Sequence, residues 1–355
     1  LMGGNSRFTA GALRCVYDGV DDLTAIMPDL TKDEIDRSDF GTYTADKFYD
    51  DMFRVTEYRT DGELCDRLVG RSRDAMRWLH KTGMKFDPIW GRQAYLIDGK
   101  FKFWGGLTVE SKGGGPGLIE QHLKLAQQNG IEIRYGVRGL SLIYDGKTVK
   151  GLKVKTNGQY EDIECKAVII ACGGFESNPE MRTRYMGPGW ELAKVRGTPY
   201  NTGDGISMAL AIGASSFGNW SGGHAVQWDY NAPEFGDLSV GDNFQKHSYP
   251  WGILVNATGR RFVDEGADFR NYTYAKYGAV VLRQPGNFAW QVFDGKIVPM
   301  LRAEYRIKRV SKVSANTIEE FAHKLEGVNP EAFLDEIKKY NAAVKKDVKF
   351  DPNIK

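Results

Sequence analysis

Residues 167–175 read AVIIACGGF, and residues 201–214 read NTGDGISMALAIGA. The first stretch is an apolar run that ends in two glycines, as in a buried strand that leads into a tight turn. The second predicts a helix start with Thr202 or Asp204 as its N-cap. A third stretch, GGNS at residues 3–6, is a further glycine loop. Glycine loops of this kind let a backbone approach a flat ligand closely.

Each of these stretches also has a purely structural explanation. AVIIACGGF is compatible with a plain strand-to-turn transition, and GGNS with an ordinary loop. Asp204 can act as a local cap, or it can accept hydrogen bonds from the ribityl or sugar hydroxyls of a cofactor. The sequence of any one stretch leaves these alternatives open.

The composition excludes several classes of protein. The 355 residues include 48 basic and 46 acidic side chains, so no nucleic-acid partner is expected. Four cysteines (Cys15, Cys65, Cys165 and Cys172) lack metal-ligand spacing, which predicts a reduced, cytoplasmic protein without a metal site. No apolar run is long enough to span a membrane, and no signal peptide is visible.

The order of the predicted elements suggests two domains. From about residue 216 the hydrophobic periodicity weakens and Trp, Tyr and Asn become frequent, so we expect domains at residues 1–215 and 216–355. The predicted elements are helices within 41–83, 118–128, 317–325 and 330–344, strands at 131–136 and 167–171, and a hairpin within 140–156 that turns at Asp145-Gly146.

Taken together and in this order, the three glycine motifs resemble those of the FAD-dependent fumarate reductase and succinate dehydrogenase flavoprotein family. Residues 252–278, GILVNATGRRFVDEGADFRNYTYAKYG, are similar to a characteristic stretch of that family. Among members of that family, tricarballylate dehydrogenases are the ones most resembled by SGGHAVQWD at residues 221–229 and by the long polar stretch at residues 231–250. The resemblance covers essentially the whole sequence.

The resemblance implies an α/β fold. Residues 1–215 would form a glutathione-reductase-like FAD-binding domain, and residues 216–355 an inserted α+β capping domain. The family's GxGxxG unit and its C-terminal return to the flavin domain are not found in the sequence, so the FAD-binding domain is expected to be incomplete and the chain to be an internal fragment. FAD is the implied cofactor.

The resemblance also implies which residues bind FAD. We expect them to converge on one pocket, although Cys172 replaces the threonine that is usual in the second motif. They are Gly3, Gly4, Asn5, Ser6, Val137, Ala171, Gly173, Gly174 and Asp204.

Arg270 matches the proton-transfer arginine of the family. Its spacing from Glu265 is one residue longer than is usual in the family. Because arginine is protonated at ordinary pH, it can act only as one link in a relay, with Glu265 or Asp268 as the carboxylate that holds it. A surface salt bridge is the structural alternative for Arg270.

His224 matches the first substrate-binding histidine of the family, although alanine follows it where proline is usual. His247 lies where the family has a threonine-glutamate pair followed by an arginine, so His247 or Lys246 is expected to replace that proton path. Either histidine could instead be a hydrogen-bonded structural imidazole. Tyr272, Tyr274 and Tyr277 are expected to pack the cap rather than contact substrate.

The activity implied by the resemblance is dehydrogenation of a polycarboxylate at a saturated C–C bond, which would convert tricarballylate to cis-aconitate. One carbon would lose a proton and its neighbour would pass a hydride to the flavin. The electron acceptor stays unidentified, a membrane-associated electron-transfer protein being one candidate. The alternatives are another fumarate-reductase-like enzyme, a 3-ketosteroid-dehydrogenase-like enzyme, and a non-catalytic fragment.

Overall fold

The computed structural model describes residues 2–103 and 106–348. The chain divides into two compact units. The first contains residues 1–181 and 196–220, and the second contains residues 182–195 and 221–355. The crossing at residues 220–221 lies close to the boundary predicted near residue 216, whereas the sequence does not predict that residues 182–195 belong to the second unit.

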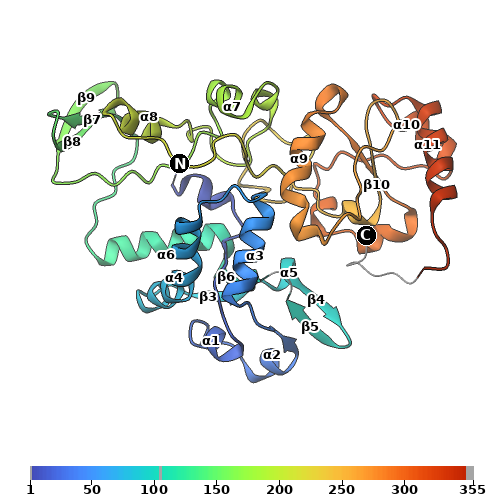
Figure 1. Cartoon of the computed structure of the whole chain (residues 1–355), viewed down its shortest axis with the longest axis horizontal. Coiled ribbons are helices and arrows are strands. Elements are labelled where there is room, and N and C mark those ends of the chain that lie inside the picture. Colours follow the sequence, from blue (N-terminus) through green and yellow to red (C-terminus); the bar gives the residue numbers. More distant parts are fainter. Residues whose placement is uncertain (1, 104–105, 349–355) are drawn as a thin grey trace. The chain divides into compact units, whose positions relative to one another are not determined.

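The first unit combines helices with three small sheets (Figure 1). The helices predicted within residues 41–83 are confirmed, and Thr44 and Asp61 cap them through side chains that accept from Lys47 and Leu64 N–H groups. The helices of this unit are α1 (Val20–Thr24), α2 (Lys32–Asp36), α3 (Ala45–Val55), α4 (Gly62–Lys81), α5 (Trp90–Gln93), α6 (Gly114–Gln128) and α8 (Asp204–Ala211), with the 3-10 turn η1 (Gly4–Phe8). Helix α7 (Pro179–Met186) begins in this unit and ends in the second.

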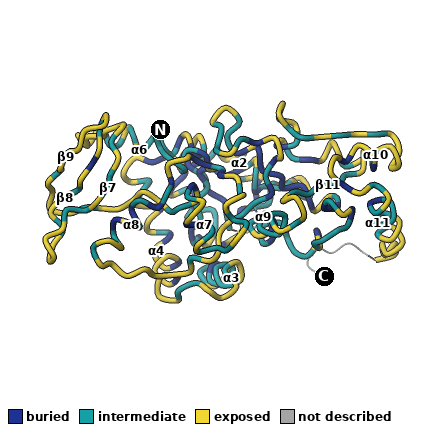
Figure 2. Tube along the Cα trace, turned by 90° about the horizontal axis from the view of Figure 1, so that it is seen from above, coloured by how far each residue is buried: buried dark blue, intermediate teal, exposed yellow. Residues whose placement is uncertain are grey.

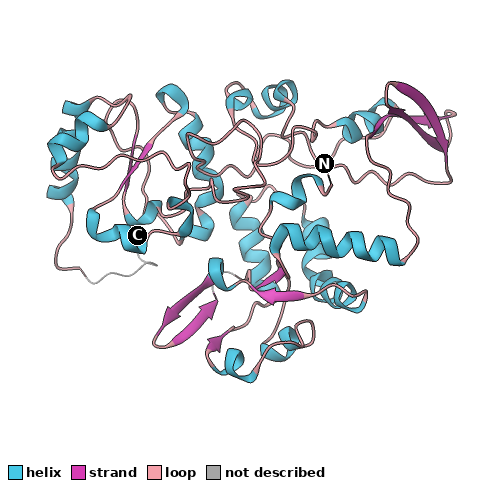
Figure 3. Cartoon of the chain, turned by 180° about the vertical axis from the view of Figure 1, so that it is seen from behind, coloured by secondary structure: helices cyan, strands magenta, loops and turns pink. Residues whose placement is uncertain are grey.

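Each sheet of the first unit has three short strands (Figure 3). The strand orders are β1 (Ala12–Leu13), β6 (Val109–Ser111), β3 (Phe86–Pro88); β2 (Ser38–Asp39), β5 (Lys100–Phe103), β4 (Ala94–Ile97); and β7 (Val137–Tyr144), β8 (Val149–Thr156), β9 (Gln159–Glu164). The predicted hairpin is confirmed as β7 and β8, whose turn is held by Asp145 Oδ1 accepting from the N–H groups of Lys147 and Thr148. Strand β9 extends the meander and is exposed along nearly its whole length (Figure 2).

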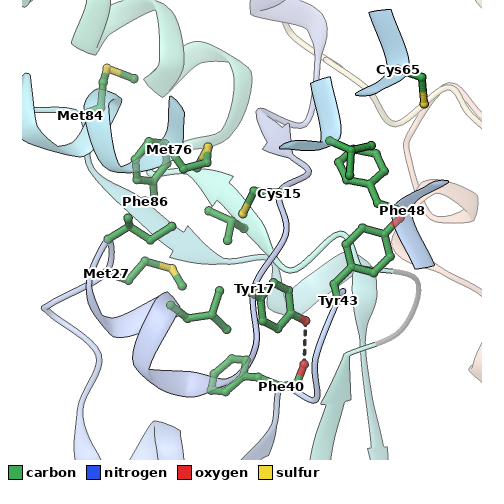
Figure 4. Close-up of a cluster of buried hydrophobic side chains, with 14 residues drawn as sticks. Cys15, Tyr17, Met27, Phe40, Tyr43, Phe48, Cys65, Met76, Met84 and Phe86 are labelled. Atoms are coloured by element: carbon green, nitrogen blue, oxygen red, sulfur yellow. Dashed lines mark hydrogen bonds between the residues drawn. The ribbon is translucent and has the colours of Figure 1, made fainter. Parts of the chain in front are cut away.

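One apolar core lies beneath α3 and α4 (Figure 4). Leu23 and Met84 are fully buried in it, and Phe48 and Met76 contribute from the two helices. The polar end of buried Tyr17 is satisfied, because its hydroxyl donates to the Phe40 carbonyl at 2.7 Å. The helical periodicity in residues 41–83 thus reflects burial at Phe48 and Met76, whereas Leu64, Leu68 and Trp78, which share the pattern, are exposed.

The two strands predicted at residues 131–136 and 167–171 do not form. Both segments are assigned no strand, and Ile131 and Ile169 are 59% and 90% exposed. An apolar run of this kind is typical of a parallel strand that is buried on both faces and paired with neighbours. Among the described residues, neither segment has a partner strand. Without backbone hydrogen bonds to a neighbouring strand, a sequence that favours the extended conformation does not form a stable strand.

The second unit is built around a two-stranded sheet and three helices (Figure 1). The helices predicted near residues 317–325 and 330–344 are confirmed, and both begin at side-chain caps, Thr317 and Asn329. The elements are β10 (Ile253–Val255) and β11 (Trp290–Val292), α9 (Tyr274–Leu282), α10 (Ile318–Lys324) and α11 (Pro330–Ala343), with 3-10 turns η2 (Trp190–Leu192), η3 (Tyr249–Trp251), η4 (Arg270–Tyr272), η5 (Pro285–Asn287), η6 (Gly295–Met300) and η7 (Ala303–Tyr305). Fully buried Phe333 packs with Val255 in the core of this unit.

Helix α9 lies directly on the backbone of residues 225–226. The Ala225 N–H donates to the Ala275 carbonyl at 2.7 Å, and the Gly278 N–H donates to the Ala225 carbonyl at 2.9 Å. A Cβ atom at Gly278 would lie 2.5 Å from backbone atoms of Ala225 and Val226. Only glycine permits this approach, which fixes the distance between α9 and the segment before it.

No helix in the described part of the chain combines the length and apolar character that crossing a membrane requires.

Replacing the apolar residues Phe333 and Ile169 by alanine is predicted to change the free energy of unfolding by different amounts. Phe333→Ala should lower the free energy of unfolding by roughly 3–5 kcal/mol, because a buried aromatic ring leaves a cavity. Ile169→Ala should change it by no more than about 0.5 kcal/mol, because the side chain is exposed. Chemical denaturation followed by circular dichroism measures both values. Equal losses would contradict the absence of the 167–171 strand.

Gly278→Ala should destabilise the second unit by roughly 1–3 kcal/mol, because the added methyl meets backbone that cannot yield cheaply. Gly222→Ala is the matched control, since nothing lies within 4 Å of a Cβ atom at that glycine. Melting temperatures of the two variants provide the comparison. A Gly278→Ala protein as stable as the control would show that the approach of α9 is looser than described.

Candidate functional site

The residues predicted from the sequence fall into two sets. The residues predicted to bind FAD lie in the first unit, and Arg270, His224, His247 and Glu265 lie in the second. Each set is described within its own unit.

The GGNS loop lies against the start of α6. Gly3 and Gly4 have φ angles of +87° and +49°, which side chains rarely adopt. A Cβ atom on Gly115, in the first turn of α6, would lie 2.4 Å from the Thr9 carbonyl and 2.7 Å from the Ser6 carbonyl. Glycine is thus required at position 115 for this contact, which predicts that Gly115 does not tolerate a larger residue.

Asn5 connects this loop to residues 197–198. Its Oδ1 accepts from the Thr198 N–H at 2.8 Å and from the Thr198 hydroxyl at 3.2 Å. A Cβ atom at Gly197 would lie 2.1 Å from the same oxygen. The Asn5 side chain is therefore a structural clamp between segments that are far apart in the sequence.

The second glycine motif meets the same segment. The Ser177 hydroxyl donates to the Thr198 carbonyl at 2.5 Å, and the Ser177 N–H donates to the Asn201 carbonyl at 3.0 Å. A Cβ atom at Gly173, whose φ is +77°, would lie 2.6 Å from Asn201 Oδ1. Thr198 thus bonds both Asn5 and Ser177, so the structure brings the first and second motifs together around residues 197–201.

Asp204 is the first residue of α8, but it does not cap the helix. The predicted N-cap, Thr202 or Asp204, is wrong: Gly203 occupies the N-cap position with φ +80°, and no side chain caps the helix. The Asp204 carboxylate instead accepts from the Thr202 hydroxyl at 2.9 Å and from Arg138 Nη2 at 2.8 Å. Val137 begins β7 immediately before Arg138.

These loops fit a flat cofactor that carries phosphates. Nothing lies within 4 Å of a Cβ position at Gly4, and Gly173 is exposed. The exposed Ser6 hydroxyl makes no hydrogen bond to any described residue. Ala171 is exposed as well. Open glycine backbone and a free hydroxyl offer the donors that FAD's diphosphate and ring system accept.

In the second unit, Tyr274 is the common neighbour of three predicted catalytic residues. Its ring lies 5.1 Å from the His224 ring and 4.9 Å from the His247 ring, both edge-on at interplanar angles of 74° and 78°. The Arg270 Cζ lies 5.6 Å from the same ring's centroid. The structure therefore brings together His224, His247 and Arg270, which are spread over 47 residues of sequence.

Backbone contacts place the two histidines. The segments that carry them run antiparallel, joined by the Trp228–Gln245 bridge and by the Lys246 N–H, which donates to the Gln227 carbonyl at 3.0 Å. His224 precedes Ala225, the residue that α9 contacts, and Tyr274 begins α9. The position of Tyr274 between the histidines thus depends on the packing of α9.

Arg270 lies in η4, and its Nη2 is buried without a hydrogen-bond partner in the described part of the chain. It forms no ion pair with any described residue, so the surface salt bridge proposed as its structural alternative is not found. A buried guanidinium donor without a partner is costly, which is the condition expected of a group that meets an anionic ligand.

Glu265 does not hold Arg270. Its carboxylate, only 4% exposed, accepts from the Leu254 N–H at 2.6 Å and pairs with Arg261. Arg261 is four residues away and reaches both oxygens, so it takes the place predicted for Arg270. The geometry makes Glu265 an anchor for β10.

Lys246 is also engaged. Its Nζ lies 3.1 Å from Asp229 Oδ2 and donates to the Phe244 and Glu304 carbonyls at 3.2 and 3.1 Å. Burial lowers the pKa of Lys246, and the Asp229 carboxylate opposes this effect. With its donors satisfied, Lys246 is a structural cation, which leaves His247 as the candidate for proton transfer.

Sequence reasoning does not identify Glu304. The Oε1 atom of Glu304 accepts from the His247 N–H at 2.9 Å, although Glu304 follows His247 by 57 residues in the chain. No motif surrounds it, and a lone glutamate between an alanine and a tyrosine carries no distinguishing signal.

The comparisons with known proteins agree with the fold of this chain. A probable fumarate reductase of Shewanella frigidimarina is 28% identical over 350 residues, which cover 97% of this chain and 53% of that protein. A 3-oxosteroid 1-dehydrogenase of Mycobacterium tuberculosis is 29% identical over 181 residues, 47% of this chain and 31% of that protein. The open form of a flavocytochrome c3 fumarate reductase matches with a TM-score of 0.67 and 24% identity, over 96% of this chain and 55% of that one.

The chain spans about half the length of the first of these relatives. The family model described as FAD binding domain matches residues 35–355. FAD is therefore the cofactor, and the chain belongs to the FAD binding domain family.

Proposed function

We propose that the complete protein is an FAD-dependent oxidoreductase that removes two hydrogens from adjacent carbons of a polycarboxylate, converting tricarballylate to cis-aconitate. The observation that carries this proposal is the assembly of His224, His247 and Arg270 around Tyr274. Carboxylates taken out of water need cationic partners or strong donors. Two imidazoles and a guanidinium beside one aromatic ring could each bind a carboxylate of a substrate that carries several.

When bound, FAD accepts a hydride from the substrate. The glycine loops of the first unit would hold it, through the backbone around Gly3, Gly4 and Gly173 and through the Ser6 hydroxyl. The adjacent substrate carbon would lose a proton to Arg270 as the guanidinium passes one of its own protons to the next link of the path. His247, on the same tyrosine ring, is the candidate for the next link, because an imidazole exchanges protons near neutral pH.

Electrons must then leave the reduced cofactor. We propose a separate electron acceptor, with a membrane-associated electron-transfer protein as one candidate, and a cytoplasmic location for the enzyme. The four cysteines are free, as expected in a reducing compartment.

Two other functions are weighed against this one. A steroid substrate is suggested by the 3-oxosteroid dehydrogenases, but an apolar steroid offers no charge to match three basic groups. A chain that holds FAD weakly and does not turn over alone is favoured by the segments 131–136 and 167–171, which form no strands; the second of them is part of the second glycine motif.

Anaerobic addition of tricarballylate to the complete FAD-loaded protein should bleach the flavin absorbance band near 450 nm. An equal concentration of 4-androstene-3,17-dione should leave the band unchanged. Bleaching by the steroid but not by tricarballylate would reject the polycarboxylate proposal. No bleaching by either, in protein that dithionite reduces fully, would reject both substrates.

Arg270→Lys should slow flavin reduction by tricarballylate about 10²- to 10⁴-fold, the range for losing a positioned proton-transfer group. Arg283→Lys is the control, because Arg283 is exposed at the end of α9 and forms no ion pair with the described residues. Stopped-flow absorbance measures both rates. Equal rates for the two variants would remove Arg270 from the proposed path.

Titration of FAD into the 355-residue chain, followed by quenching of flavin fluorescence, tests the weak-binding alternative. Each missing charge-assisted contact of about 1.5–3 kcal/mol weakens binding by roughly 10- to 100-fold. We expect binding weaker than stoichiometric. Tight stoichiometric binding would show that the described glycine loops suffice.

A further inference from the structure

We propose that Glu304 is a positioning residue for His247: its buried carboxylate fixes the imidazole and stabilises the protonated form, so that His247 can receive and hold a proton. The part that Glu304 plays in turnover rests on the proposed function, whereas the coupling of the two side chains can be measured without any activity.

The contacts of Glu304 point to His247. Glu304 Oε1 accepts from the His247 N–H at 2.9 Å and lies 3.8 Å from His247 Nδ1. The other oxygen accepts from Arg302 Nε at 3.3 Å. Glu304 and His247 are only 3% and 5% exposed, so water screens their interaction little.

The segment that carries Glu304 cannot move independently of His247. The Arg302 N–H donates to the Ser248 hydroxyl at 3.2 Å, and the Ser248 N–H donates to the Tyr305 hydroxyl at 2.8 Å. The Tyr305 hydroxyl in turn donates to Gln291 Oε1 at 2.5 Å. These bonds hold residues 302–305 and 246–248 in one register, which keeps the carboxylate beside the ring.

The charges around His247 favour its cationic form. Lys246 already has Asp229 as a close partner at 3.1 Å. Burial raises the pKa of Tyr305 far above its ordinary value, so this phenol stays neutral. The neutral Tyr274 ring and the Glu304–Arg302 pair also face His247. Glu304 places an anion 3.8 Å from the imidazole Nδ1, and an adjacent anion raises the pH at which a histidine releases its proton.

The test uses NMR titration of the 355-residue chain labelled in its histidines. The chain has five histidines, and single His→Gln variants assign each signal. Glu304→Gln keeps an acceptor for the His247 N–H but removes the charge. It should lower the titration midpoint of His247 by about 1 pH unit, a tenfold change in proton affinity. The midpoint of His224, which Glu304 does not contact, should move much less.

Glu265→Gln is the matched control. Glu265 is equally buried, accepts a backbone N–H and pairs with an arginine four residues away, but it contacts neither histidine. It should leave the His247 midpoint in place. Equal shifts in both variants, or no shift in Glu304→Gln, would overturn the proposal.

A measurement on the unaltered chain covers the case in which Glu304→Gln does not fold. The ¹⁵N shifts of neutral His247 should show the proton on Nδ1, the nitrogen beside the carboxylate. A proton found on Nε2 instead would overturn the proposal.

The role in turnover is then measured in the complete FAD-loaded protein. If His247 accepts the proton that leaves the substrate, it must be neutral in the free enzyme, so kcat/KM rises as pH rises through the His247 midpoint. Glu304→Gln should move this rise to lower pH by about the same 1 pH unit that NMR shows. An NMR shift without a matching shift in the pH profile would reject the role in turnover and leave the Glu304–His247 coupling intact.

Discussion

The ring of Tyr274 is the surface on which the basic side chains of the second unit meet, and its position depends on one close contact between backbones. Gly278 lets α9 approach the backbone of Ala225, which places Tyr274 between the segments that carry His224 and His247. An aromatic ring supports neighbouring cations through its electron-rich face without neutralising them.

The first unit is constrained in a different way, by glycines that permit contact between distant segments. Asn5 and Ser177 are separated by 172 residues, yet both bond to Thr198. The glycines at 3, 173 and 203 adopt positive φ, and those at 115 and 197 leave room for a neighbour. The motifs are thus parts of one folded loop cluster rather than separate binding elements.

The sequence predicts the local elements well and the paired elements poorly, for a physical reason. Helices such as α4 and α11 are fixed by periodicity and by the caps Asp61 and Asn329, which are all local. A strand at residues 167–171 would need a neighbouring strand to pair with, and the local residue pattern does not show whether such a neighbour is present. The resemblance predicts Arg270 and the two histidines as site residues, and the structure brings all three to the Tyr274 ring. It also predicts that Glu265 could hold Arg270, which is wrong, because nothing in the sequence says that Arg261 reaches that carboxylate.

Two buried acids of the second unit are paired with cations other than Arg270. Glu265 is matched to Arg261, and Asp229 to Lys246. Each pair satisfies a charge that would be costly to bury alone. Arg270 is not matched in this way among the described residues, whereas His247 lies beside the Glu304 carboxylate, which also pairs with Arg302. Arg270, whose guanidinium lies at the Tyr274 ring, is therefore a cation that has no anionic partner among the described residues.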